Sequence, residues 1–249
     1  MITSRDNPKV KVAIKLRESA RARKEQGLFF LEGFRLCSDA MASGHEPQTL
    51  FATQEALEKY SLHPASCILI TESVAQKLGD TKTPQGMFGV WKQEAKNKRQ
   101  DFWRPGGRYI ALEHVQDPGN FGGAARTAEA LGISGLLISG GCDIYHPKAL
   151  RASMGALLRL PVLEVENLAE ELAACNLPCY AAVPDGAAIP VNKIEFSNGA
   201  VVLIGNEGGG LSLEAIKACE VAITIPMNGR MKSLNAAAAA TILMWEMVK

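Results

Sequence analysis

Short apolar runs alternate with helical patterns through the C-terminal half of the chain. We predict strands at 109–112, 135–139, 161–164, 179–183, 200–204 and 221–225, and helices near 122–132, 148–157, 168–175, 212–218 and 234–248. Strands that alternate with helices are joined by crossover connections and run parallel. The run at 201–204 is apolar throughout, as expected where helices cover both faces of a sheet. This pattern predicts an α/β domain built on a parallel sheet.

The first part of the chain has a different pattern. Helical patterns at about 8–24 and 33–43 are mixed with strand-like runs at 48–52, 67–70 and 86–91, which indicates a small α/β domain. The segment 93–107 is polar and basic and ends in Arg104, Pro105, Gly106 and Gly107, a composition typical of a linker. We therefore expect a domain at 1–95, a linker at 96–107 and a second domain at 108–249.

Positive charge is concentrated in two stretches, although the net charge is only +1. The first 24 residues carry eight basic residues against Asp6 and Glu18, and the second stretch holds Lys92, Lys96, Lys98, Arg99, Arg104 and Arg108. Clustered cations of this kind are able to contact nucleic-acid phosphates. A solvated helix face and a solvated linker explain the same charges, and both interpretations stay open.

Composition excludes several classes of protein. The six cysteines have neither CxxC spacing nor histidine partners at zinc spacing, so we expect reduced thiols, no metal and a cytoplasmic location. The N-terminus is charged from Arg5 onward and has no apolar signal region. The longest apolar run, 236–248, is interrupted by Glu246 and is too short to span a bilayer, so we expect no membrane association.

Three strand-to-helix junctions carry the candidate functional residues. At 117–126 a strand ends, Pro118 and Gly119 turn the chain, and a helix begins that we expect to place Arg126 one turn in, facing the loop. A surface arginine beside a tight turn is the alternative. At 205–211 a glycine-rich loop follows an apolar strand, but it matches neither the dinucleotide fingerprint nor the Walker loop. This mismatch argues against a nicotinamide enzyme and against an ATPase.

The third junction lies at 225–235. Pro226 ends a strand, Asn228 and Gly229 turn the chain, and either Ser233 or Asn235 is placed to cap the last helix. Capping alone would explain both residues.

In this order and spacing the three junctions resemble the motifs of the SpoU/TrmH family of RNA 2'-O-methyltransferases. Those motifs read N-x-G-x-x-x-R, G-x-E-G-x-G, and I-P-M followed by S-L-N. The matching residues are Asn120, Gly122 and Arg126, then Gly205, Glu207, Gly208 and Gly210, then Ile225, Pro226, Met227, Ser233, Leu234 and Asn235. The segment 151–156 also resembles a family segment. The resemblance covers about 108–249, and the first ~95 residues are similar to the family's RNA-binding domain, which is itself similar to certain ribosomal proteins. One departure is Ala236 and Ala237, where many members carry Val-Ser.

The resemblance implies a parallel sheet whose C-terminal segment forms a trefoil knot, S-adenosylmethionine as cofactor, and a homodimer that completes each active site. By position, Gly205, Ile225, Met227 and Leu234 would contact the cofactor. The residues implied for RNA handling and catalysis are Arg126, Asn120, Glu207, Ser233 and Asn235.

The implied reaction is attack of a ribose 2'-hydroxyl on the cofactor's methyl group, which requires alignment and the removal of one proton. The resemblance gives that proton to Arg126, yet a guanidinium stays charged in proteins. Either a neighbour such as an RNA phosphate draws the proton from Arg126, which then acts as base, or Arg126 is an electrostatic clamp for the developing alkoxide. The sequence leaves both open.

We therefore expect an RNA ribose 2'-O-methyltransferase, acting on ribosomal RNA more readily than on transfer RNA. A non-catalytic RNA-binding protein that keeps the fold is the alternative. A small-molecule oxidoreductase lacks its fingerprint in this sequence.

Overall fold

The computed structural model describes residues 1–61, 63, 66–93, 99–231 and 233–249. The chain forms two compact units, Met1–Ala95 with Asp143–Arg151, and Lys96–Cys142 with Ala152–Lys249. The basic residues Lys96 and Lys98, and with them part of the expected linker 96–107, lie outside the described residues. The assignment of RNA binding to 1–95 and of catalysis to 108–249 stays a prediction.

The first unit is a mixed α/β structure, as its sequence pattern predicts. Its sheet has the order β1-β4-β2-β3, in which β4 is antiparallel to both neighbours and β3 is parallel to β2. The elements are α1 (Pro8–Glu18), α2 (Ala20–Gln26), β1 (Leu28–Glu32), α3 (Phe34–Ala42), β2 (Pro47–Thr53), α4 (Gln54–Lys59), β3 (Ile68–Ile70), α5 (Glu72–Leu78) and β4 (Met87–Lys92).

The helix expected at 8–24 is two helices. Ser19 has extended backbone, and its side chain accepts a hydrogen bond from the Ala22 N–H, so it ends α1 and caps α2. Strand β1 was not predicted, although four apolar residues begin it. Helices α1 and α5 pack on Phe30, Phe51 and Phe88 of the sheet.

The second unit contains the parallel sheet that the sequence predicts. Its strand order is β7-β6-β5-β10-β8-β11-β9, and every pairing is parallel. The strands are β5 (Arg108–Glu113), β6 (Gly135–Ser139), β7 (Val162–Val165), β8 (Cys179–Ala182), β9 (Ile189–Pro190), β10 (Ala200–Ile204) and β11 (Val221–Thr224). The six predicted strands are confirmed, and among the described residues of this unit the short β9 is the one strand additional to them.

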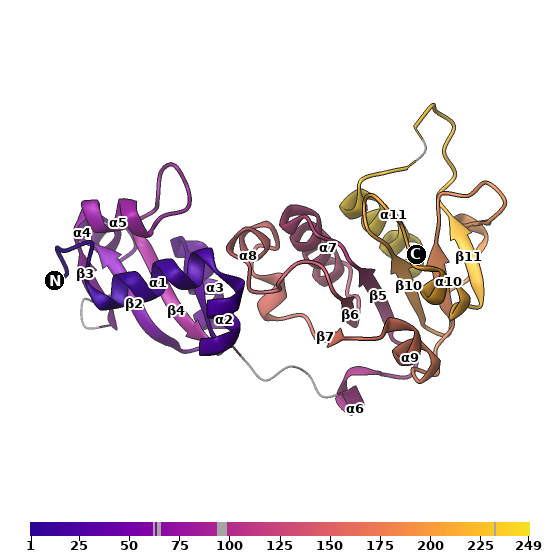
Figure 1. Ribbon diagram of the computed structural model, residues 1–249, viewed down its shortest axis with the longest axis horizontal. Coiled ribbons are helices and arrows are strands. Elements are labelled where there is room, and N and C mark those ends of the chain that lie inside the picture. Colours follow the sequence, from indigo (N-terminus) through magenta and orange to yellow (C-terminus); the bar gives the residue numbers. More distant parts are fainter. Residues whose placement is uncertain (62, 64–65, 94–98, 232) are drawn as a thin grey trace. The chain divides into compact units, whose positions relative to one another are not determined.

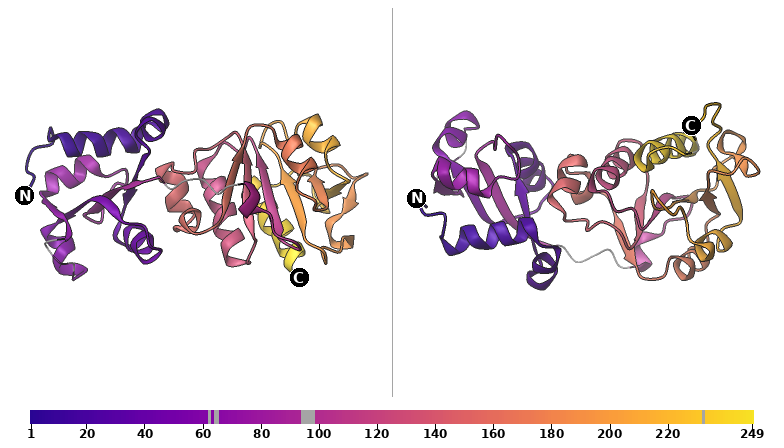
Figure 2. Two further views of the ribbon diagram at one scale, coloured as in Figure 1. Left: turned by 90° about the horizontal axis from the view of Figure 1, so that it is seen from below. Right: turned by 45° about the horizontal axis from the view of Figure 1, so that its top comes forward.

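Helices cover both faces of this sheet (Figures 1 and 2). Helices α7 (Pro118–Ala130) and α11 (Ala236–Val248) pack against each other and over β5, β6 and β10. On the other face lie α6 (Arg99–Phe102), α9 (Leu168–Ala173) and α10 (Leu213–Lys217), over a buried cluster that includes Tyr109, Ala111 and Leu203. The remaining elements are α8 (Pro147–Ala152), which belongs with the first unit except at its last residue, and the 3-10 turns at Ala156–Leu158 and Val191–Lys193.

Two helix boundaries differ from the prediction. Helix α7 begins at Pro118 and not near 122, because Asp117 caps it and proline is well suited to a first helical position. The helix expected at 148–157 ends at Ala152, and the chain continues through Gly155 at a φ of 82° into a 3-10 turn. In the described part of the chain, none of the helices has the length and apolar character needed to cross a bilayer.

The sheet order brings the three motif-bearing junctions to one edge. Strand β10 lies between β5 and β8, and β11 lies on the other side of β8. Because these strands are parallel, the loops that follow β5, β10 and β11 all leave the sheet at its carboxyl edge.

Candidate active site

The loop after β10 folds back on itself. Asn206 and Gly210 exchange two backbone hydrogen bonds of 3.1 and 2.9 Å, and the Asn206 Oδ1 accepts the N–H groups of Gly208 and Gly209. A Cβ on Gly205 would lie 2.1 Å from the Gly210 carbonyl carbon. Glycine is therefore required at 205 by the closure of the loop itself, whereas a Cβ at Gly209 would face open space. Gly210 has a φ of 69°, a backbone conformation that also favours glycine.

A chain of side-chain hydrogen bonds joins the three motifs. The Asn120 Nδ2 donates to the Glu207 Oε1 at 2.9 Å, and the Asn235 Nδ2 donates to the Asn120 Oδ1 at 2.7 Å. The Asn235 Oδ1 in turn accepts the N–H groups of Ala237 and Ala238, which caps α11. The prediction of a cap at this junction is confirmed for Asn235.

The two side-chain hydrogen bonds of this network run in one direction, from Asn235 to Asn120 and from Asn120 to Glu207. An ionised carboxylate only accepts hydrogen bonds, so Glu207 takes the NH2 of Asn120, whose oxygen then faces the NH2 of Asn235. At its other end Asn120 is fixed by its backbone N–H, which donates to the Asp117 Oδ1 at 2.9 Å. Three of the predicted catalytic residues are thus held together from positions 120, 207 and 235.

A cavity of about 410 Å³ lies beside this network. The four residues predicted to contact a cofactor, Gly205, Ile225, Met227 and Leu234, all line it, as do Glu207 and Ser233. Its walls are otherwise mainly aliphatic and come from Ala182, Val183, Pro184, Ile204, Leu211, Ile216, Ala236, Ala239 and Leu243. This volume is within the roughly 300–1,000 Å³ range of small-molecule sites. Aliphatic walls beside a backbone-rich loop suit a flat ring with polar edges.

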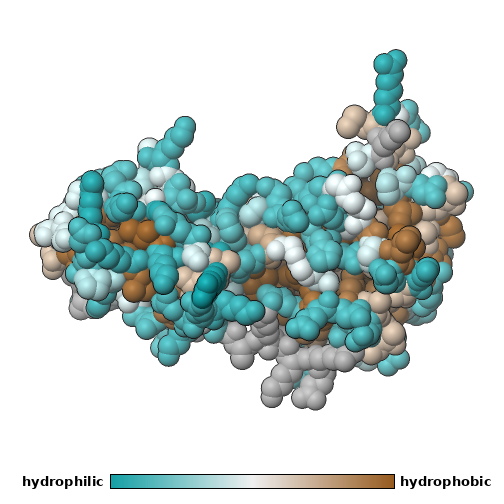
Figure 3. Space-filling model, in the orientation of Figure 1, coloured by the Kyte–Doolittle hydropathy of each residue, from teal (hydrophilic) through white to brown (hydrophobic). Residues whose placement is uncertain are grey.

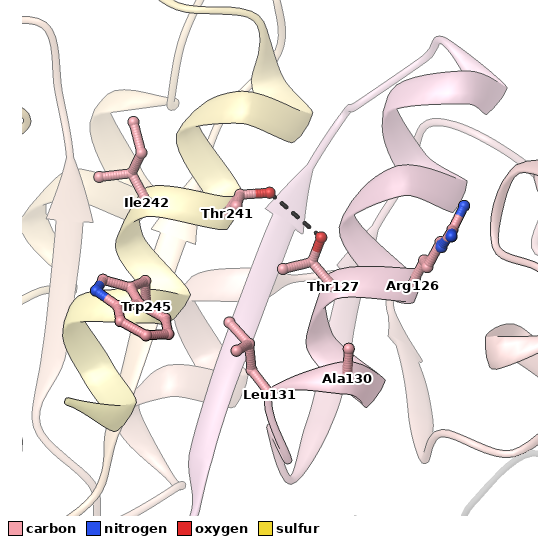
Figure 4. A pocket seen from close by; sticks show the side chains of 7 residues that line it. All are labelled: Arg126, Thr127, Ala130, Leu131, Thr241, Ile242 and Trp245. Carbon is pink, nitrogen blue, oxygen red and sulfur yellow. Dashed lines mark hydrogen bonds between the residues drawn. The ribbon is translucent and has the colours of Figure 1, made fainter.

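Arg126 is not among the residues that line this cavity. It lies about two turns into α7, because the helix starts earlier than expected, and its side chain is exposed. The expected position one turn into the helix is therefore wrong, and the expectation that Arg126 faces the loop stays a prediction. Arg126 lies at the edge of a groove of about 400 Å³ between α7 and α11 (Figure 4).

This groove between α7 and α11 is apolar. Its lining includes Ala130 of α7, Leu131 just after that helix, and Ile242 and Trp245 of α11. The Thr127 and Thr241 hydroxyls lie 3.3 Å apart across it. The Trp245 side chain is 57% exposed and Ile242 is 36% exposed. A further apolar area is visible in Figure 3, in the part of the second unit where Figure 1 draws α10 and β11. Exposed apolar surface of this kind is typical of protein–protein interfaces.

Sequence reasoning gave no role to Asn206, Ser212 and Glu113, which shape the loop after β10. The Asn206 Nδ2 donates to the His114 carbonyl oxygen, and Ser212 donates two hydrogen bonds to Glu113. These contacts depend on β5 lying next to β10, which the local pattern does not reveal. Among the described residues there is no group of three or more His, Cys, Asp or Glu side chains arranged to hold a metal ion.

Comparison with known proteins adds a family relationship to this geometry. The SpoU rRNA Methylase family matches residues 107–245, more than half of the chain, and the MRM3-like substrate binding domain matches residues 7–89. The chain is 32% identical to an uncharacterized tRNA/rRNA methyltransferase of Synechocystis sp., covering 98% of this chain and 92% of that protein. It is 28% identical to the 23S rRNA (guanosine(2553)-2'-O)-methyltransferase of Bacillus subtilis, covering 99% and 98% of the two chains.

Solved structures show the same similarity. The AdoMet-bound rRNA methyltransferase from Sinorhizobium meliloti has a TM-score of 0.87 and 30% identity, covering 99% of this chain and 96% of that one. The SpoU methyltransferase AviRb from Streptomyces viridochromogenes, in complex with AdoMet, has a TM-score of 0.84 and 27% identity, covering 97% of each chain.

Proposed function

Because this chain belongs to the SpoU rRNA Methylase family, we propose that it transfers the methyl group of S-adenosylmethionine to a ribose 2'-hydroxyl of RNA, and that ribosomal RNA is favoured over transfer RNA. The observation that carries the proposal is the Asn120–Glu207–Asn235 network beside the cavity. Two relatives that align over nearly their full length support it, since they are named or described as rRNA methyltransferases.

The cavity fits S-adenosylmethionine by size and by chemistry. Ile225, Met227 and Leu234 offer apolar contacts to an adenine ring, and the backbone around Gly205 offers polar groups to its edges and to the ribose. When bound, the sulfonium supplies an activated methyl group. The protein's own contribution is then to align the RNA hydroxyl and to manage its proton.

The polar residues have proposed roles that follow from their positions. Asn120 and Asn235 hold Glu207 at the cavity, where its carboxylate is placed to orient the ribose. Ser233 lines the cavity and is exposed, so its hydroxyl is available to the RNA. Arg126 handles the departing proton, either as a base relieved of its own proton by a neighbour or as a clamp for the developing alkoxide.

A homodimer is part of the proposal. Arg126 does not line the cavity of its own chain, and the apolar groove beside it on α7 and α11 suits a second copy of the chain. An interface built on this groove would bring Arg126 to the cavity of the partner. The C-terminal segment that carries α11 is also the one proposed to form a trefoil knot.

The remaining elements of the proposal concern RNA binding and location. The match to the MRM3-like substrate binding domain at 7–89 supports RNA recognition by the first unit. Its exposed cations Lys9, Lys15 and Lys24 are suited to phosphate contacts. A cytoplasmic location is consistent with six cysteines that form no disulfide, including Cys175 and Cys179, whose sulfur atoms lie 3.7 Å apart.

A methyl-transfer assay tests the proposed function directly. Purified protein and labelled S-adenosylmethionine are offered ribosomal RNA, transfer RNA and assembled ribosomal subunits from a strain that lacks this gene, followed by nucleoside analysis. We expect a 2'-O-methylated nucleoside in ribosomal RNA, naked or assembled. Methylation of transfer RNA alone would overturn the substrate, a base-methylated product would overturn the mechanism, and cofactor binding without transfer to any RNA would favour the non-catalytic RNA-binding alternative.

Replacing Asn120 by aspartate tests the network. The new carboxylate would face Glu207 in place of an NH2 donor, so repulsion replaces a charge-assisted hydrogen bond. We expect the single-turnover methylation rate to fall roughly tenfold to a hundredfold, the effect of losing one hydrogen bond to a charged group in the transition state. The rate is measured with saturating cofactor and RNA.

Asn167 provides a matched control for this variant. Its Nδ2 donates to the Glu170 Oε1 at 2.7 Å at the start of α9, where neither residue lines the cavity. Asn167→Asp therefore makes the same chemical change away from the site and should retain the rate. Equal losses in the two variants, or an Asn120→Asp rate within twofold of wild type, would contradict the assigned role.

A further inference from the structure

The loop at 205–212 is fastened at both ends to two consecutive residues, Glu113 at the end of the neighbouring strand and His114 directly after it. At its start, the Asn206 Nδ2 donates to the His114 carbonyl oxygen at 2.8 Å. At its end, the Ser212 N–H and hydroxyl each donate to a different oxygen of Glu113 at 2.7 Å. Glu113 is the last residue of β5, which pairs with β10 immediately before the loop. Glu207 and the glycines therefore project from a loop that is held at both ends.

Glu113 is a buried charge with matched donors. Its side chain lies on the same face of β5 as Tyr109 and Ala111, and the residue is only 6% exposed. A buried carboxylate is costly unless it accepts hydrogen bonds, and here a backbone N–H and a hydroxyl supply them. The bond geometry at Ser212 is thus fixed by Glu113.

Ser212 links this carboxylate to the helix that follows. While its hydroxyl donates to Glu113, its oxygen accepts the Ala215 N–H at 3.1 Å and so caps α10. Leu211 precedes Ser212, and Ile216 lies in α10 after it; both line the cavity. The position of Ser212 consequently sets the position of two walls of the cavity.

His114, which accepts the hydrogen bond from Asn206, has a constrained backbone conformation. Its backbone has a φ of 53°, a left-handed conformation that is uncommon outside glycine. Its ring lies against Gly140, where a Cβ would be 2.4 Å from the His114 Nδ1. This unusual conformation directs the His114 carbonyl to Asn206 while Glu113 reaches Ser212.

We propose that Glu113, which lies outside the three motifs, is a positioning residue for the cofactor. Through Ser212 it fixes Leu211, Ile216 and the end of the loop, so that the cavity is preformed before the cofactor arrives. This inference rests on the proposed function, because it takes S-adenosylmethionine as the molecule that the cavity binds.

Glu113→Gln tests the inference by calorimetric titration of the full-length protein with S-adenosylmethionine. The amide keeps the size of the side chain but presents an NH2 group to one of the two Ser212 donors. We expect the Kd to rise about tenfold, as for the loss of one charge-assisted hydrogen bond. In turnover, we expect the KM for the cofactor to rise with it while the KM for RNA is unchanged. Glu113→Asp, which keeps the carboxylate, should recover part of the affinity.

Glu171→Gln is the matched control. Glu171 is also 6% exposed in the same unit and accepts a hydrogen bond from the Trp103 Nε1 at 2.8 Å, but it does not line the cavity. The Glu171→Gln variant should bind S-adenosylmethionine with the Kd of the wild-type protein. An equal rise in Kd in this control would show a general effect of neutralising a buried carboxylate and would overturn the inference.

Ser212→Ala serves if Glu113→Gln does not fold, which circular dichroism and thermal unfolding will reveal. It removes only the hydroxyl and leaves the backbone N–H bond, so we expect a rise in Kd of about threefold. Asn167→Ala, which removes the cap of α9, controls for the loss of a helix cap. Unchanged affinity in folded Glu113→Gln or Ser212→Ala would overturn the positioning role. Wild-type protein that does not bind S-adenosylmethionine at all would instead overturn the proposed function.

Discussion

Arg126→Ala is expected to lower the rate of methyl transfer roughly a thousandfold, the upper range for removal of a single group that stabilises developing charge. Its affinity for S-adenosylmethionine should stay within about twofold of wild type, since a group that makes no contact with a ligand contributes little to binding it. The physical reason is the separation in the structure: Arg126 lies on α7 and does not line the cavity. Single-turnover kinetics measure the expected loss of rate, and calorimetric titration measures the expected retention of cofactor affinity.

The outcome for the cofactor decides whether this division of roles holds. A loss of affinity as large as the loss of rate would mean that Arg126 shapes the cavity and has no separate part in the chemistry. Arg159→Ala is a control. Arg159 forms an ion pair with Glu129, which lies on α7 as Arg126 does, and Arg159 has no proposed part in the reaction. This variant should remove an arginine from the surface of the unit without removing activity.

Arg126→Lys separates the two mechanisms that the sequence leaves open. Lysine keeps the positive charge but loses its proton near pH 10.4 in water, whereas arginine stays charged. If the residue acts as a base, the rate of the lysine variant will rise with pH as the neutral amine forms. If it acts as a clamp, the rate will fall over the same range because the charge disappears. The wild-type profile over that range provides the comparison.

The sequence predicts those features that local pattern determines. The apolar runs at 136–138 and 200–204 lie in strands because such runs are buried on both faces of a parallel sheet. The helix start at Pro118 was placed four residues late because Pro118 and Gly119 suggested a turn, although Asp117 and proline already form a good cap. In the first unit, strand β1 was not predicted, because its short apolar run stands between two helical patterns.

The site residues also fall into those that local motifs identify and those that depend on tertiary packing. Asn120, Glu207 and Asn235 were identified from their motifs, and the structure brings them within hydrogen-bonding distance. Glu113 was not identified, because its role depends on β10 pairing with β5, two strands separated by 86 residues. The position of Arg126 relative to a cavity was also beyond the sequence, since the groove beside it appears only when α7 and α11 pack together.

Trp245→Glu is expected to convert the proposed dimer to a monomer and to lower methyl transfer about a hundredfold. A carboxylate placed in the apolar groove loses hydration on burial against mainly aliphatic side chains, and burying a charge in such surroundings is among the costliest changes at an interface. Analytical ultracentrifugation gives the mass and the transfer assay gives the rate. Ile189→Glu, which adds the same charge at an exposed residue of β9, should change neither. A Trp245→Glu variant that remains a dimer with full activity would place the interface elsewhere.

Mixing two inactive variants then shows whether Arg126 acts across the interface. In a heterodimer of Arg126→Ala and Glu207→Ala, one site would combine the intact Glu207 of the first chain with the intact Arg126 of the second. After subunit exchange in an equal mixture, half of the dimers are heterodimers with one such site each, so about a quarter of the wild-type activity should return. If Arg126 served the cavity of its own chain, no dimer in the mixture would hold a complete site and activity would stay absent. Repeating the mixture with the Trp245→Glu change in both chains should abolish the recovery, because the composite site requires the interface formed by α7 and α11.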